Sequence, residues 1–454
     1  MSMYTQHRAR ALEVLAGEQA AAVLFTHSLK TRNHDCDYRF RPESTFWHQS
    51  GFAEPDSVLV LLPGSSPERA AEEGSDQTAA PRSVLFLRPK DREKETWTGR
   101  RLGVEAAPEV LGVDEAVDIG ELWTRLPELL KGRERIVYRF GEDADRDRRM
   151  GGVARALRAL ARGGVEPPVE WIDPAPLFHE LRLFKSEAEL VLMRRAAELT
   201  AEAHKRAMAA TAPGVNEAEI DALIEYTFRR AGSTGCAYTN IVAGGAGACI
   251  LHYVENDAPL LDGDLLLVDA GAEWDYYACD VTRTWPVNGT FNDEQRALYE
   301  VVLAAEENAI DVVAPGVAFS AVHEAALTVL VQGLLDLGLL SGSIDEALAD
   351  ETYKRFFMHK TSHWLGLDVH DCGAYTIAGE MRPLEPGMVF TVEPGLYVAS
   401  DDESVEERWR GIGIRIEDDV LVTEQGSEVL TAAIPKTPAA VEAAVSGQLA
   451  AARS

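Results

Sequence analysis

The sequence predicts a two-domain protein of the α/β class, with an N-terminal α/β domain and a C-terminal α+β domain that contains an internal repeat. Three observations support this fold class. The chain has 454 residues, more than a single hydrophobic core usually serves. Its first third alternates short apolar runs with helical patterns, and two similar segments recur in the second half.

The first domain is expected to contain buried strands separated by helices. Short apolar runs with β-branched residues occur at 21–26, 57–63, 83–89 and 135–140. A polar segment rich in small residues separates the second run from the third and predicts an exposed loop. A helical pattern follows at 148–163.

Two long helical patterns open the second domain. Ser186, with a glutamate three residues later, matches a capping box at the start of the pattern at 184–211, and a second pattern covers 217–232. We place the domain boundary just ahead of these helices. The N-terminal domain is then 1–178 and the C-terminal domain 179–454.

The second domain contains an internal sequence repeat. Residues 261–271 align with residues 385–395, so that Asp269 matches Glu393 and the flanking glycines also match. Each copy reads as a turn, an apolar strand and then a carboxylate. The repeat predicts that the domain has two related halves, and that each half contributes one acidic side chain to a common site.

An aspartate pair follows the first copy. If the turn between the strands at 265–269 and 278–285 is centred between Trp274 and Asp275, Asp269 lies directly opposite Asp280 on one face. Like charges among apolar neighbours are destabilising unless a positive charge lies between them. We therefore expect a divalent cation at this pair.

Further ligand candidates lie downstream. Glu393 and Glu417 each stand in an apolar strand pattern, where glutamate is rare unless it is paired or ligating. Arg415 shares a face with Glu417 and offers a salt bridge as the alternative explanation of that buried acid. The candidate imidazoles are His252, His359, His363 and His370.

Charge balance predicts two metal ions. Four carboxylates carry four negative charges, which two divalent ions neutralise, whereas one ion would leave buried charge uncompensated. The oxygen-rich donor set favours manganese or cobalt, with zinc and iron as further candidates. Two ions about 3.5–4 Å apart can hold a bridging water, deprotonated near neutral pH, as the nucleophile toward a polarised carbonyl.

Composition excludes several classes of protein. The formal net charge of −30 disfavours nucleic acid and anionic membranes as partners. The five cysteines show no CxxC spacing, which argues against a disulfide scaffold and a thiolate zinc site. We find no signal-peptide pattern and no apolar stretch of membrane-spanning length, so we expect a cytoplasmic protein.

The ordered motifs resemble a known family. VDAG, CDVTRTWPV, SHWLGLDVHD, TVEPGLY and GIGIRIEDD are similar to motifs of the pita-bread metallopeptidases, and within these to aminopeptidase P. RPESTFWHQSGFAEPDSVLVL and WTGRRLG resemble the N-terminal domain of that group. The resemblance implies a creatinase-like N-terminal domain for oligomerisation and substrate access, and a catalytic pita-bread domain with a pseudo-twofold repeat. It also implies an Xaa-Pro aminopeptidase, which removes the first residue from peptides with proline in second position.

The resemblance also implies roles for individual residues. Asp280 and Glu417 would bridge the two ions, and Glu393 would also shuttle a proton from the attacking water. His252 and His370 would stabilise the tetrahedral intermediate and the scissile carbonyl. The full set of implied metal ligands is Asp269, Asp280, His363, Glu393 and Glu417.

Substrate binding is implied for five further residues. His359, Tyr397 and Arg415 would shape the proline pocket. Asp35 and Trp97 match N-terminal positions that approach the active site, Trp97 from a neighbouring subunit. The chain departs from the family at one point, because Lys360-Thr361 follows His359 where glycine is common.

Alternative functions remain. A prolidase, which cuts only Xaa-Pro dipeptides, has a similar fold and metal set. A methionine aminopeptidase usually lacks so large an N-terminal domain, and a creatinase-like amidinohydrolase lacks the metal ligands. A non-catalytic binding or chaperone module would typically have lost ligands that are all present here. The resemblance further implies a homodimer or homotetramer.

Overall fold

The computed structural model describes residues 2–64 and 80–451, which form two compact units, Met1–Arg182 and Leu183–Ser454. The boundary that we expect from the sequence, between residues 178 and 179, falls within the helical turn Ala175–His179. The loop predicted after residue 63 lies mostly outside the described residues. No helix in the two described stretches is long and apolar enough to cross a membrane.

The first unit is built around a six-stranded mixed sheet. Its strands follow the order β6-β5-β4-β1-β7-β8, in which β1 runs antiparallel to β4 and parallel to β7. The strands are β1 (Ala20–Phe25), β4 (Val58–Leu62), β5 (Arg82–Leu87), β6 (Glu115–Asp118), β7 (Arg135–Val137) and β8 (Glu170–Ile172). The four predicted strands correspond to β1, β4, β5 and β7, whereas β6 and β8 escaped prediction.

Helices cover both faces of this sheet. Alternate residues of β1 enter two different cores: Ala22 packs with Leu15 of α1 (Met3–Gly17), and Val23 packs with Val153 of α7 (Ala144–Ala159). The period of two along each strand explains this division. The remaining helices of the unit are α2 (Ser44–Ser50), α4 (Arg92–Thr98), α5 (Ala107–Leu111) and α6 (Leu122–Leu129).

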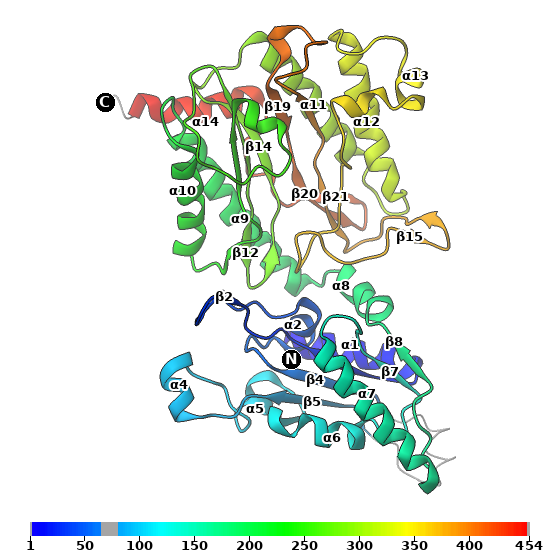
Figure 1. Cartoon of the computed structure of the whole chain (residues 1–454). Coiled ribbons are helices and arrows are strands. Elements are labelled where there is room, and N and C mark those ends of the chain that lie inside the picture. Colours follow the sequence, from blue (N-terminus) through cyan, green and yellow to red (C-terminus); the bar gives the residue numbers. More distant parts are fainter. Residues whose placement is uncertain (1, 65–79, 452–454) are drawn as a thin grey trace. The chain divides into compact units, whose positions relative to one another are not determined.

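The second unit places helices around a set of central strands (Figure 1). The predicted capping box is present, since the Ser186 backbone N–H donates to Glu189 at 2.7 Å at the start of α9. The helices are α8 (Glu180–Leu183), which crosses the boundary, α9 (Glu187–Ala210), α10 (Glu217–Arg230), α11 (Asp293–Asp311), α12 (Phe319–Asp336), α13 (Ile344–Ala349) and α14 (Pro438–Ala451).

The backbone conformation confirms the internal sequence repeat. Gly263 and Gly387 adopt nearly equal positive φ angles, +91° and +92°, just before the two matching strands. Each strand pairs antiparallel with a later one, β11 (Leu265–Asp269) with β14 (Thr282–Pro286) and β17 (Val389–Val392) with β20 (Asp418–Thr423). Short hairpin strands lie between: β12 (Ala272–Trp274) with β13 (Tyr277–Ala278), and β18 (Gly395–Val398) with β19 (Ile412–Arg415).

The short strands β9 (Gly235–Cys236) and β10 (Ile241–Gly244) add to the first half, and β21 (Gly426–Val429) adds to the second. Peripheral hairpins occur in both units, β2 (Thr31–Asn33) with β3 (Cys36–Asp37) and β15 (Thr376–Ile377) with β16 (Glu380–Met381).

The predicted register of the aspartate pair is wrong. Asp269 pairs with Thr282, not with Asp280. The turn is centred between Asp275 and Tyr276, whose φ angles of 49° and 69° suit a tight hairpin turn. Because the shift in register is two residues, Asp280 stays on the same face as Asp269, in a diagonal position.

A buried ion network joins the two halves of the repeat. Arg283 of β14 donates to Asp418 Oδ1 of β20 at 2.7 Å and to the Glu417 carbonyl at 2.5 Å. Lys436 Nζ bridges Asp418 Oδ2 and Glu306 Oε1, at 2.8 Å from each. Burial alone would raise the pKa of Asp418, but Arg283 and Lys436 hold it well below its usual range.

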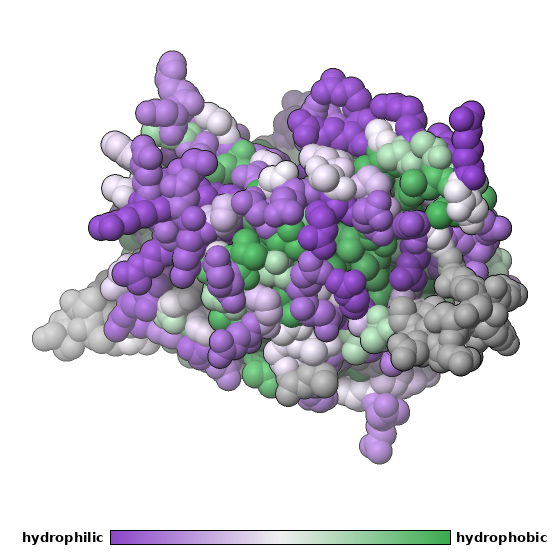
Figure 2. All heavy atoms as spheres, turned by 90° about the horizontal axis from the view of Figure 1, so that it is seen from below, coloured by the Kyte–Doolittle hydropathy of each residue, from purple (hydrophilic) through white to green (hydrophobic). Residues whose placement is uncertain are grey.

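Hydrophilic side chains cover most of the face drawn in Figure 2, with hydrophobic groups between them. This distribution agrees with the 26% of charged residues and the large negative net charge.

Removal of the buried arginine should destabilise the protein. We expect Arg283→Met to lower the free energy of unfolding by about 3–5 kcal/mol, because Asp418 would remain buried without its main partner. Urea denaturation measures the change. Arg206→Met is the matched control, since Arg206 pairs with Glu202 at the surface, where we expect a loss of at most about 1 kcal/mol. Equal losses in the two variants would contradict the role of the network.

Candidate active site

One cavity of about 650 Å³ lies in the second unit. Its wall contains all five acids and imidazoles that the sequence indicates as metal ligands, together with His252, His359, His370 and Arg415. The ligand candidates come from five separate places in the chain, namely the end of β11, the segment before β14, the loop that follows His359, the residue after β17 and the segment between β19 and β20. Folding thus brings together residues that are far apart in the sequence.

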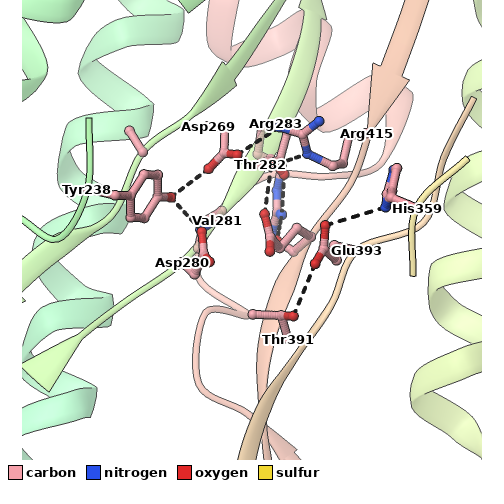
Figure 3. Close-up of polar contacts among 12 residues, drawn as sticks. Tyr238, Asp269, Asp280, Val281, Thr282, Arg283, His359, Thr391, Glu393 and Arg415 are labelled. Atoms are coloured by element: carbon pink, nitrogen blue, oxygen red, sulfur yellow. Dashed lines mark hydrogen bonds and ion pairs between the residues drawn. The ribbon is translucent and has the colours of Figure 1, made fainter. Parts of the chain in front are cut away.

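Asp269 is held from two sides. The Tyr238 hydroxyl donates to its Oδ1 atom at 2.6 Å, and Arg415 Nη2 donates to its Oδ2 atom at 2.7 Å (Figure 3). Arg415 therefore pairs with Asp269, whereas we had considered it as a partner for Glu417. The two hydrogen bonds fix the orientation of the Asp269 carboxylate.

Asp280, His363 and Glu417 form a compact group of donor atoms in the cavity. One ligand atom from each lies within 4.8 Å of those of the other two. His363 Nε2 is 3.3 Å from Asp280 Oδ2 and 3.6 Å from Glu393 Oε1. Its Nδ1 atom is 3.0 Å from the Trp364 carbonyl oxygen, an arrangement in which Nδ1 donates and Nε2 faces the cluster.

Burial shifts the pKa values of the acids and of His363 in this cluster. Burial raises the pKa of Glu393 to about 7, against the opposing effect of His363, and holds the pKa of Glu417 well above its usual range. Burial likewise raises the pKa of Asp269, although Arg415 opposes this. Burial by itself would lower the pKa of His363, but Asp280 and Glu393 raise it to about 9. The cluster thus attracts positive charge.

The donor set fits divalent cations. Four carboxylates converge on the cavity, and Arg415 is the one guanidinium among the described residues that line it. Burial raises the pKa of Glu393 and Glu417, so a nearby cation favours their charged forms. Carboxylate oxygens with one imidazole are ligands for a hard or borderline divalent metal.

Hydroxyl groups of two threonines form hydrogen bonds that orient the candidate ligands. Thr282 Oγ1 donates to Glu417 Oε2 at 2.6 Å and accepts from Arg415 Nε at 2.8 Å. Thr391 Oγ1 accepts from the His363 backbone N–H at 3.1 Å and lies 3.5 Å from Glu393 Oε1 (Figure 3). Thr282 of β14 therefore holds a ligand from the second half of the repeat, and Thr391 of β17 contacts His363 and Glu393.

Hydrogen bonds link the side chains of His359, Tyr397 and Arg415. His359 Nε2 is 2.8 Å from the Tyr397 hydroxyl, which accepts from Arg415 Nη1 at 3.1 Å. His359 Nδ1 lies 3.8 Å from Glu393 Oε2. Burial and the nearby Arg415 lower the pKa of His359 to about 4, so the imidazole is neutral at pH 7.

His252 and His370 line the cavity with exposed side chains. The His370 ring is 4.3 Å from the His363 ring, centroid to centroid, in an edge-on arrangement. Partial burial and His363 lower the pKa of His370. Both histidines can therefore offer an N–H group to a molecule in the cavity.

The two predicted N-terminal residues belong to the other unit. Asp35 is exposed between β2 and β3, and Trp97 is 85% exposed in α4. Their roles in substrate binding remain predictions.

Several residues of the site escaped the sequence analysis. Tyr238, Thr282 and Thr391 act on the acids through hydroxyl groups, and His323 contributes to the cavity wall. Single hydroxyl residues in apolar strands carry no periodic signal. The motif CDVTRTWPV contained Thr282, but nothing in the sequence distinguished it from its neighbours.

Comparisons with known proteins support the geometry. The model of metallopeptidase family M24 matches residues 191–424, and the model of the aminopeptidase P N-terminal domain matches residues 4–138. The Xaa-Pro aminopeptidase of Escherichia coli is 45% identical over 96% of this chain and 96% of its own length. Xaa-Pro aminopeptidase 3 of Homo sapiens is 34% identical over 93% of this chain and 80% of its own length.

Solved structures agree with the sequence relatives. Zn-substituted E. coli aminopeptidase P in complex with product superimposes with a TM-score of 0.92, at 43% identity, and 99% of each chain is covered. Aminopeptidase PepP from Pseudomonas aeruginosa also gives a TM-score of 0.92, at 45% identity, with 98% of this chain and 99% of that chain covered. With its cavity of converging acids, this chain belongs to metallopeptidase family M24, as a metallo-exopeptidase of the aminopeptidase P group with the pita-bread fold.

Proposed function

We propose that the protein is a dinuclear-metal Xaa-Pro aminopeptidase, which hydrolyses the first peptide bond of peptides with proline in second position. The observation that carries this proposal is the convergence of four carboxylates and His363 on one cavity. The substrate class is supported by the relatives, since those of E. coli, Haemophilus influenzae and Homo sapiens are all named Xaa-Pro aminopeptidases.

We assign two divalent ions to the cluster. The residues that would hold them are Asp269, Asp280, His363, Glu393 and Glu417, and the family resemblance implies that Asp280 and Glu417 would be shared between the ions. Such ions would supply an activated water molecule as the nucleophile and polarisation of the scissile carbonyl. Manganese is our first candidate because the donors are mostly oxygen, and cobalt and zinc are the next. The Zn-substituted E. coli relative shows that a related site accepts zinc.

Glu393 is suited to move a proton. Its side chain lines the cavity, and burial raises its pKa above the usual range to about 7. Its two oxygens face His363 and His359 at 3.6 and 3.8 Å. We therefore propose that Glu393 accepts a proton from the attacking water and passes it to the leaving proline nitrogen.

The histidines stabilise and position the substrate. His252 and His370 line the cavity with side chains free to donate to the oxygen that becomes negatively charged during attack. Neutral His359, Tyr397 and Arg415 form the proposed wall of the proline pocket. A peptide bond to proline lacks an N–H group, so the ring must be recognised by shape.

The prolidase alternative is not favoured, because the named relatives that match nearly the whole chain are Xaa-Pro aminopeptidases. A homodimer or homotetramer, a cytoplasmic location, and roles for Asp35 and Trp97 in substrate access remain predictions from the sequence.

A substrate panel tests the proposed activity. The protein loaded with Mn²⁺ should release the first residue from Xaa-Pro-Yaa tripeptides and longer peptides, and chelation should abolish the activity. The matched controls replace the second-position proline with alanine and should remain uncut. Liquid chromatography of the products gives kcat/KM for each peptide. Cleavage confined to Xaa-Pro dipeptides would instead establish a prolidase.

Metal binding should release protons. At pH 7 the metal-free site holds protons on His363, whose pKa is about 9, and partly on Glu393, whose pKa is about 7. Bound ligands must be deprotonated, so the apparent affinity should rise about tenfold per pH unit for each proton displaced. The rise should level off above pH 9. Titration calorimetry of Mn²⁺ in two buffers with different ionisation enthalpies counts the protons, and identical heats in both would contradict this prediction.

Two histidine variants separate metal binding from catalysis. His363→Ala should lose both metal and activity, because a direct ligand is removed. His370→Ala should keep its metal content and lose about 10²–10³-fold in kcat, as expected for a group that stabilises the transition state. Metal analysis and kcat are measured on the same samples, with exposed His27→Ala as control. Loss of metal from His370→Ala would show that its assigned role is wrong.

A further inference from the structure

One wall of the cavity carries a lysine that the proposed mechanism does not use. Lys360 lines the cavity beside residues from the start of α12, among them Ser320 and His323. Its side chain is exposed, and within residues 2–64 and 80–451 it has no ion-pair partner. An unpaired lysine is notable in a chain whose formal net charge is −30.

The ammonium group of Lys360 acts on the cavity. His323, whose Nδ1 atom is 2.8 Å from Thr361 Oγ1, is a neutral neighbour on the same wall. Burial and, next, the positive charge of Lys360 lower the pKa of His323 to about 4. The field of Lys360 therefore reaches the wall, and His323 adds no competing cation.

The cavity carries charge of both signs. Four acids line it, and Lys360 on the loop after Phe357 and the neutral His323 on α12 line it as well. Lys360 directly follows His359, which lies 3.8 Å from Glu393. Consecutive Cα atoms are about 3.8 Å apart, so the Lys360 backbone is one residue removed from the proposed proline pocket.

A short peptide also carries charge of both signs. Beyond the scissile bond, a bound peptide would continue through proline to its third residue. An extended chain advances about 3.3–3.6 Å per residue, which puts the third residue about 7 Å beyond the scissile bond. A carboxylate at that point would lie within the field of an unpaired ammonium group.

We propose that Lys360 forms a carboxylate-binding subsite, which favours substrates with a negative charge at the third position. This inference rests on the proposed Xaa-Pro aminopeptidase activity. The carboxylate can be the C-terminus of a tripeptide or the side chain of an acidic third residue.

Four matched peptides test the subsite: Ala-Pro-Ala as the free acid, and Ala-Pro-Ala, Ala-Pro-Asp and Ala-Pro-Lys as C-terminal amides. The metal-loaded wild-type protein should favour the free acid and the aspartate peptide over neutral Ala-Pro-Ala amide by about three- to fivefold in kcat/KM, mainly through KM. The lysine peptide should be the poorest substrate. The preference should shrink as ionic strength rises from about 0.02 to about 0.5 M, because the ammonium group is exposed.

Variants assign the preference to one side chain. Lys360→Gln should abolish the preference for a negatively charged third position, and Lys360→Arg should retain this preference. Lys360→Glu should reverse the preference, so that the lysine peptide becomes the better substrate. The matched control is Lys354→Gln, since Lys354 pairs with Glu351 at the surface and does not line the cavity. Metal content and thermal unfolding of each variant confirm that the centre and the fold are intact.

The outcomes are distinct. If the protein prefers only the free-acid peptide, the ligand of Lys360 is the C-terminal carboxylate. If it prefers both the free-acid peptide and the aspartate peptide, the subsite accepts any carboxylate at the third position. If all four peptides are cleaved and Lys360→Gln leaves their ratios unchanged, the subsite is disproved while the activity stands. If the wild-type protein cleaves none of them, the proposed function fails, and the subsite fails with it.

Discussion

Negative charge held in a confined space is the constraint on which the rest of this structure depends. Four carboxylates converge on one cavity, and the protein supplies Arg415, paired to Asp269, as the single guanidinium on its wall. Burial, with mutual repulsion as a further cause, raises the pKa of Glu417 and Glu393, so the cluster favours bound protons or metal ions. The acids that this fold brings together therefore offer a site for divalent cations.

The internal repeat explains how the fold brings the acids together. Each half places one carboxylate at the end of a strand, Asp269 as the last residue of β11 and Glu393 directly after β17, and adds a second just ahead of the returning strand β14 or β20. The halves are then joined directly behind the ligands. Arg283 of the first half pairs with Asp418 of the second, next to Glu417. This buried network resists separation of the halves and so fixes the distances between the acids.

Charge is distributed unevenly around the cavity. His359 is neutral although it lies near Glu393, because burial and Arg415 lower its pKa. His323 is neutral for a similar reason, with Lys360 as the nearby cation. Acids, neutral imidazoles and an exposed lysine thus line one cavity. A peptide has a positive amino terminus and a negative carboxyl terminus, and a lining with charges of both signs can complement it.

The sequence by itself determined the fold class, the strands that carry the acids and the cavity residues His252, His359, His363 and His370. It did so because a carboxylate in an apolar strand is costly unless it has a partner, and this cost is visible locally. Tertiary structure alone decided the register that sets Asp269 opposite Thr282, since the turn depends on positive φ angles at Asp275 and Tyr276. It also decided the partners Tyr238 and Arg415 of Asp269, because contacts between residues far apart in the chain leave no periodic trace in the sequence.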